Sequence, residues 1–256
     1  MANRNFLKSS NPMFNEDKMR ANGKVDTLDS DMITRASEVM TISGAINKTF
    51  ILLGIMMITT LFSFAYPSQM FMYIGIFGGI GVVMYANYNP DKSSWLAPIY
   101  ALLEGLFVGT VSAIYANVAG TSGIIFQAVS LTVALLFMML FIYKSGLIKV
   151  TQKFRAGVSM AVGAIMLVYL LNFVLSFFGM NVPYIHEGGM IGIGISVVII
   201  VVACLRLLLD FDNFDKAAQM KSPKYMEWFC AMGLLVTLVW LYYEVLRLLA
   251  VLSSGD

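Results

Sequence analysis

The sequence predicts an all-α, polytopic membrane protein with seven transmembrane helices. Of its 256 residues, 59% are hydrophobic and only 12% are charged, and the mean hydropathy is +0.77. A soluble domain typically carries about 25% charged residues. The apolar residues form long continuous runs, whereas the strands of a membrane β-barrel alternate between apolar and polar positions. The runs therefore indicate membrane-spanning helices, whose backbone groups are all satisfied within the segment.

The apolar runs follow a polar stretch at the N-terminus. Residues 1–44 carry mixed charge and are predicted to form a cytoplasmic, partly flexible tail, and residues 45–252 a transmembrane domain. Each run has about 20 residues or more, enough to cross a hydrocarbon core of roughly 30 Å at 1.5 Å per residue. The short breaks at 66–68 and 119–121 predict antiparallel neighbours. The expected helices cover 45–65, 69–88, 96–117, 122–144, 156–178, 189–209 and 226–252.

Basic residues are distributed unevenly among the connections. With seven spans, every lysine and arginine except Arg247 falls in the N-terminal part or beside the loops after the second, fourth and sixth helices. Loops that carry Lys and Arg remain on the cytoplasmic side of a membrane. The sequence therefore predicts a multi-pass protein of the cell membrane, specifically the inner membrane of a bacterium, with a cytoplasmic N-terminus and an external C-terminus.

Small residues are concentrated in three of the predicted helices. Small residues let helix backbones approach closely in lipid, so we expect these positions to form helix–helix contacts. They are Gly75, Gly78, Gly79 and Gly81, then Gly105 and Gly109, and finally Gly188, Gly189, Gly192 and Gly194.

Three carboxylates lie inside or beside apolar runs, where a charged group costs roughly 2.5–3.5 kcal/mol at the bilayer centre. Glu104 falls about 12 Å into the third helix. Asp210 closes the sixth apolar run, with Arg206 one turn before it on the same face. Glu244 lies in the seventh helix, with Arg247 one turn further on. An ionisable residue at such depth indicates a functional site with a partner.

Structural explanations of the same carboxylates remain open. Glu104 would then be a protonated carboxyl bonded to a neighbouring helix. Asp210 and the more exposed Asp212 and Asp215 would form an acidic cluster where a helix leaves the membrane. Glu244 and Arg247 would form a local pair that reaches the outer surface.

Enzymatic chemistry has little support in the sequence. The single histidine, His186, falls in a predicted external loop, and metal-ligand motifs such as HExxH are missing. We find no pairing of a nucleophile with a base. We therefore expect no enzymatic activity, no cofactor and no nucleic-acid partner.

Three segments resemble a bacterial branch of the transmembrane Bax inhibitor motif, or Bax inhibitor-1, family. LLLDFDNF at 207–214 is similar to the end of the family's sixth helix, with Asp210 in the place of its aspartate. LYYEVLRLLAVL at 241–252 is similar to the final helix, with Glu244 in the place of its acid. YALLEGLFVG at 100–109 resembles the third helix of some branches.

This resemblance implies seven helices with the seventh in the centre, and a passive calcium leak gated by pH through two hydrogen-bonded carboxyls. Two carboxylates within about 6 Å share a proton, and losing it adds repulsion that can move a helix. Asp210 and Glu244 would form this pair and bind Ca²⁺ transiently, since hard cations take oxygen ligands. Glu104 would line the ion path. The residues expected to tune the site by ion pairing are Arg206, Arg247, Asp212 and Glu227.

Two questions remain open at this point. Because many positions separate Asp210 from Glu244, a simple hairpin would leave them at different depths. Either residues 213–225 form an extra surface segment, or the last helix is broken, or Glu104 or Glu227 is the partner of Asp210.

The alternative function is a regulatory protein that binds membrane proteases or other membrane complexes through residues 1–44 and the basic loops. A proton-coupled transporter is less favoured, since the two halves show no repeat.

Overall fold

The computed structural model describes residues 39–176, 178 and 190–253. Seven of the described helices are long and apolar enough to cross a membrane, which confirms the predicted all-α polytopic fold. All of them belong to the unit Met40–Asp256. Tail residues 1–38, His186, Gly188 and Gly189 lie outside the described residues. The helices are α2 (Ile42–Ala65), α3 (Gln69–Tyr88), α4 (Ser93–Val118), α5 (Gly123–Ser145), α6 (Gln152–Ser176), α7 (Met190–Gln219) and α8 (Met226–Ser253), with a 3₁₀ turn, η2 (Pro90–Lys92), before α4.

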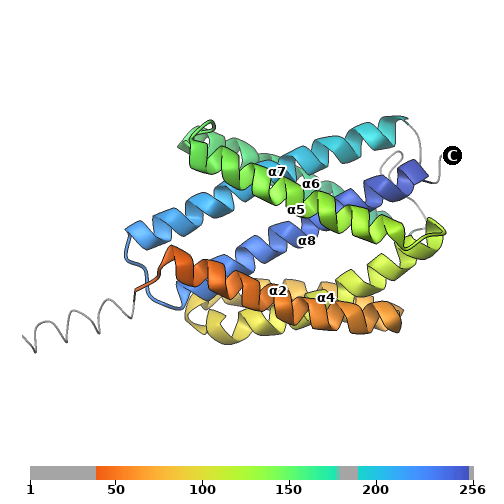
Figure 1. Ribbon diagram of the computed structural model, residues 1–256, viewed down its shortest axis with the longest axis horizontal. Coiled ribbons are helices and arrows are strands. Elements are labelled where there is room, and N and C mark those ends of the chain that lie inside the picture. Colours follow the sequence, from red (N-terminus) through yellow and green to blue (C-terminus); the bar gives the residue numbers. More distant parts are fainter. Residues whose placement is uncertain (1–38, 177, 179–189, 254–256) are drawn as a thin grey trace, which may run out of the picture. The chain divides into compact units, whose positions relative to one another are not determined.

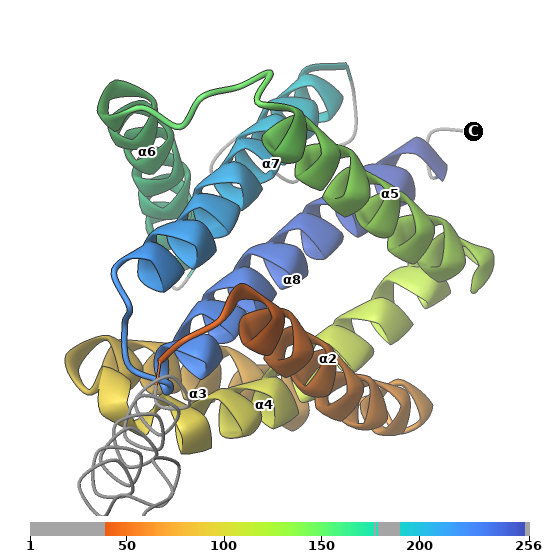
Figure 2. The same ribbon diagram turned by 60° about the vertical axis from the view of Figure 1, so that its left-hand side comes forward.

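Helix α8 lies in the centre of this unit, as expected for the seventh span. It runs between α2 and α4 on one side and α5 and α7 on the other (Figures 1 and 2). In its most apolar stretch 61% of the residues are buried inside the protein, against 6% in α6. Figure 2 shows α6 beside α7 and away from α2 and α4. Helix α6 therefore presents most of its surface to the surrounding lipid.

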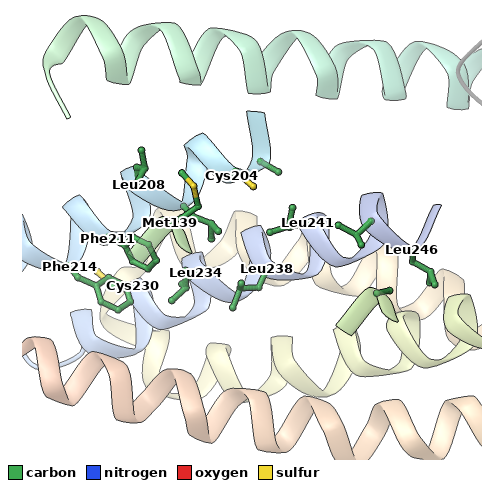
Figure 3. Packing of buried hydrophobic residues seen from close by; sticks show 14 of the residues in the cluster. Met139, Cys204, Leu208, Phe211, Phe214, Cys230, Leu234, Leu238, Leu241 and Leu246 are labelled. Carbon is green, nitrogen blue, oxygen red and sulfur yellow. The ribbon is translucent and has the colours of Figure 1, made fainter. Parts of the chain in front are cut away.

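The hydrophobic core follows the contact between α7 and α8. Leu208 and Phe211 of α7 belong to the same buried cluster as Leu234 and Leu238 of α8, and Met139 of α5 joins them (Figure 3). These side chains repeat every three or four residues, so each helix turns one continuous face to the other. This packing fixes the register between the two helices that carry Asp210 and Glu244.

Helix α7 is longer than the apolar run that predicted it. The expected span ended at residue 209, but the helix continues to Gln219. Ion pairs one turn apart support the extension, Arg206 with Asp210 at 3.5 Å and Lys216 with Asp212 at 2.7 Å. The buried Phe211, Phe214 and Ala217 repeat at helical spacing over the same residues. The hydropathy pattern missed this part because its outer face is charged.

Helices α2 and α4 approach closely at two glycines. A Cβ atom on Gly105 would lie 2.5 Å from the backbone oxygen of Met56, and one on Gly109 would lie 2.2 Å from that of Thr60. The hydroxyl of Ser63 donates a hydrogen bond to the carbonyl of Gly105 across this contact, at 3.0 Å. The close packing expected at these two glycines is confirmed, whereas Gly81 and Gly194 face open space in the described structure.

Candidate functional site

Asp210 joins α7 to the central helix. Its side chain is almost fully buried, and the hydroxyl of Thr237 on α8 donates a hydrogen bond to its Oδ2 at 2.6 Å. On the other side, Nε of Arg206 lies 3.5 Å from Oδ1, so the ion pair expected within α7 is present. Because a carboxylate deprived of water needs donors, both contacts stabilise Asp210, and the hydrogen bond from Thr237 holds α7 and α8 together at this depth.

Glu244 belongs to a second buried network, which connects three helices. Its exposed fraction is 0% and that of Arg247 is 4%, so both members of the pair are enclosed. Arg247 donates to Glu244 Oε2 at 2.7 Å and to the hydroxyl of Ser196 on α7 at 3.2 Å. The hydroxyl of Tyr169 on α6 donates to Glu244 Oε1. The pair is therefore not the surface pair considered from the sequence, but a link between α6, α7 and α8.

The expected contact between Asp210 and Glu244 is not formed. Thr237, the partner of Asp210 on α8, precedes Glu244 by seven residues, which is about 10 Å along a helix. Because α7 continues past Asp210 and α8 is unbroken, the antiparallel register brings Thr237 rather than Glu244 opposite Asp210. In this arrangement the two carboxylates cannot share one proton or ligate one calcium ion together.

Glu104 and Glu227 are not the missing partner either. Glu227 is buried at the start of α8, where Oε1 accepts hydrogen bonds from the backbone N–H and the hydroxyl of Thr41, both at 3.0 Å. Nζ of Lys224 lies 3.2 Å from the same oxygen. Glu227 therefore ties the segment before α2 to the turn before α8. Glu104 is half-buried on α4. Its carboxylate lies against Gly79 of α3, where Oε2 is 2.9 Å from the position that a Cβ atom on this glycine would occupy.

Asp212 is held by basic residues at the end of α7. Arg155, near the start of α6, contacts Asp212 through Nη2 and donates a hydrogen bond from Nη1 to Asn213 Oδ1 at 2.8 Å. Nζ of Lys216 lies 2.7 Å from Asp212. Arg206 lies on the deeper side of these two residues. Arg155, Arg206 and Lys216 together form the basic cluster, which connects α6 to α7.

Two neighbouring cavities lie beside α8. The first has a volume of about 610 Å³, and its lining includes Glu104, Tyr100 and Tyr169. The second has a volume of about 580 Å³, and its lining includes Asp210 and the basic cluster. Both cavities have four lining residues in common, namely Val83, Met166, Val236 and Trp240. A wall of apolar side chains thus separates the cavity that contains Asp210 from the cavity that contains Glu104. Glu244 lines neither cavity, although its hydrogen-bond partner Tyr169 lines the first.

No metal-binding cluster accompanies these acids. Within residues 39–176, 178 and 190–253 there is no group of three His, Cys, Asp or Glu side chains that could hold a metal ion. Any contact between a cation and Asp210 or Glu104 would therefore be made by single carboxylates. A bound Ca²⁺ takes six to eight oxygen ligands, more than one carboxylate supplies.

The sequence interpretation missed Tyr169 and Ser196 as partners of the buried pair. Both interrupt long apolar runs, Tyr169 within LVYLL and Ser196 within GIGISVV. A polar side chain in the middle of a span was therefore the signal that pointed to them. Their association with Glu244 and Arg247 required knowing that α6 and α7 both approach α8, which local sequence does not reveal.

Replacing Tyr169 with phenylalanine is expected to lower the free energy of unfolding by about 1.5–3 kcal/mol, the usual value of a hydrogen bond to a charged group. The ring and its packing are kept, while a buried carboxylate loses a donor. Unfolding in detergent micelles, followed by circular dichroism, measures the change. The control is Tyr66→Phe, because Tyr66 is exposed. Equal stability of the two variants would show that Glu244 does not depend on the phenol.

Together these features define a polytopic membrane protein whose central helix carries a buried ion pair. The pattern of the Bax inhibitor 1 like family matches residues 10–254, and the chain belongs to this family. A search of curated proteins finds no match. The family assignment confirms the resemblance drawn from the three segments around Glu104, Asp210 and Glu244.

Proposed function

We propose that this protein is a proton-sensitive cation leak, with Ca²⁺ as the conducted ion. The observation that carries the proposal is the pair of cavities beside α8, which share four lining residues and contain one carboxylate each, Asp210 and Glu104. Ionised carboxylates lower the cost of bringing a cation to membrane depth. The resemblance to the Bax inhibitor family, which implies a calcium leak, agrees with this reading.

The wall between the two cavities would act as the closed gate. Its members Val83, Met166, Val236 and Trp240 are apolar or aromatic, and hydrophobic constrictions close ion paths by excluding water. Opening the wall would require α6 or α3 to move away from α8. Helix α6 is suited to this role, because it is the least enclosed of the described helices.

Proton sensitivity would arise at Asp210 and Glu104 separately, not from a shared carboxyl proton. Protonation of Asp210 removes the negative charge that faces Arg206 on its own helix, Arg155 on α6, and the thiol of Cys230 on α8. The ion pair with Arg206 is then lost, and so is the attraction for a cation. Protonation of Glu104 removes the charge from the other cavity. We therefore expect cation flux to fall as the pH is lowered and to rise as it is raised.

Flux measurements in liposomes test the proposal. Purified protein is reconstituted in calcium-loaded vesicles, and efflux is followed with a calcium dye between pH 6 and 8. Wild-type vesicles are expected to leak faster than empty ones and faster at higher pH. Asp210→Asn and Glu104→Gln should each reduce the flux several-fold and flatten its pH dependence. The matched control is Asp91→Asn, because Asp91 is exposed in η2.

Two outcomes would contradict the proposal. If wild-type vesicles leak no faster than empty ones, the protein is not a leak, and a regulatory role toward membrane proteins becomes the better explanation. If Asp210→Asn and Glu104→Gln keep the wild-type flux at every pH, ions do not pass these carboxylates. The melting temperature of each variant shows whether a lost flux reflects a misfolded protein.

A further inference from the structure

The cavity at Asp210 changes character along its length. At one end it is lined by Arg155, Lys216 and Asn213, which lie near the start of α6 and the end of α7. At the other end it is lined by Val83, Met166, Val236 and Trp240, which also belong to the neighbouring cavity. The cavity therefore has a polar, basic mouth at a membrane surface and an apolar interior at membrane depth.

The basic mouth retains positive charge after its internal ion pairs are counted. The three members of the basic cluster face two carboxylates, Asp210 and Asp212. A third acid, Asp215, precedes Lys216 but accepts a hydrogen bond from the hydroxyl of Tyr143 on α5 and forms no ion pair with the basic cluster. The ion pairs therefore leave one basic side chain of the cluster in excess, at a mouth that is only partly enclosed, since the side chains of Arg206 and Lys216 are 35% and 42% exposed. A guanidinium has five N–H donors and an ammonium three, so these groups can bind a further anion while keeping their carboxylate contacts.

The apolar interior is reached from the side of the protein that α3 and α6 border. These two helices meet at the rings of Phe77 and Phe173, whose centroids are 6.3 Å apart. Both Met166 and Phe173 of α6 line the first cavity, together with Ile76 and Ile80 of α3. Each cavity falls within the volume range of about 300–1,000 Å³ that is typical of small-molecule sites. In a membrane, the molecules adjacent to such a space are lipids.

We infer that this space is a binding site for one anionic phospholipid. Its phosphate would bind at the basic cluster, and one acyl chain would lie against Val83 and Met166, in the apolar part of the same cavity. Basic pockets between transmembrane helices bind anionic headgroups in this way. The charge of the mouth selects an anionic lipid over a zwitterionic one, and the apolar interior selects a lipid over free phosphate. The inference does not rest on ion conduction.

Lipid titration of the purified full-length protein tests this site. Phosphatidylglycerol, phosphatidylcholine and inorganic phosphate are each added in detergent, and bound lipid is counted by native mass spectrometry. We expect one tightly bound phosphatidylglycerol per chain, weaker binding of phosphatidylcholine, and no displacement of the lipid by phosphate. The double variant Arg206→Gln/Lys216→Gln should bind phosphatidylglycerol about 30-fold more weakly, given the typical contribution of each basic residue.

Two further variants separate the headgroup from the chain. Lys149→Gln is the control for charge, because Lys149 is exposed in the loop before α6. Val83→Phe fills the apolar wall without changing charge and should also weaken phosphatidylglycerol binding. Equal binding of phosphatidylglycerol and phosphatidylcholine, or unchanged binding by the double variant, would overturn the inference. Unchanged binding by Val83→Phe, or complete displacement by inorganic phosphate, would overturn the acyl-chain part of it.

Discussion

Replacing Arg247 with methionine is expected to destabilise the folded protein by about 3–5 kcal/mol, the usual cost of breaking a buried ion pair by removing one partner. Glu244 has no exposed surface, and Arg247 provides its positively charged partner at 2.7 Å. Methionine fills part of the volume, and of the hydrogen-bond donors to Glu244 among the described residues it leaves the hydroxyl of Tyr169. Equilibrium unfolding in mixed micelles measures the loss.

The double variant Arg247→Met/Glu244→Gln provides the critical comparison. It removes both charges, and replacing a buried ion pair by neutral groups is often nearly neutral for stability. We therefore expect it to be more stable than Arg247→Met alone. The matched control is Lys224→Met, because Lys224 also pairs with a glutamate three residues away but its side chain is 51% exposed. If Arg247→Met loses no more stability than this control, the pair is not essential to the fold.

Replacing Gly109 with alanine is expected to separate α2 from α4 and to cost about 1–3 kcal/mol or more, as overpacking does. The added Cβ would lie 2.1 Å from Oγ of Ser63 and 2.2 Å from the backbone oxygen of Thr60. The serine side chain can rotate away, but the backbone oxygen moves only with its helix. The melting temperature in detergent and the distance between spin labels on α2 and α4 measure the two effects.

Gly54→Ala is the matched control for this substitution. Gly54 also lies within a transmembrane helix, but a Cβ there meets no atom within 4 Å. Because alanine favours helix over glycine by about 1 kcal/mol, the control should be as stable as the wild type or more so. A Gly109→Ala variant as stable as Gly54→Ala would mean that the two helices adapt without loss.

The number and order of the membrane helices were predictable from the sequence, because a long apolar run specifies a span by itself. The breaks were equally clear where residues such as Pro67 and Gly120 interrupt the runs. The end of α7 was misjudged, since a helix that pairs its charges one turn apart and buries Phe211 and Phe214 looks too polar for a span. Hydropathy indicates whether a segment lies in lipid or in water. It does not indicate the residue at which the helix ends, and α7 continues beyond its apolar run.

The partners of the buried acids were only partly predictable. Arg206 and Arg247 were identifiable because each lies one turn from its carboxylate, within the same helix. The contact of Asp210 with Thr237 depends instead on the register between α7 and α8. That register follows from the length of α7 and of the connection at 220–225, so a small error in the predicted end of α7 moves the expected partner by whole turns.

The central position of α8 has a consequence for biosynthesis. It is the last of the seven helices to leave the ribosome, yet α2, α4, α5 and α7 all pack against it. The earlier helices must therefore enter the bilayer before the helix that packs at their centre has been made. Glu244 and Arg247 disfavour the partition of this helix into lipid by itself. Tyr169 and Ser196 belong to helices made earlier and can receive these two side chains, so the docking of α8 is also the step that shields the charges.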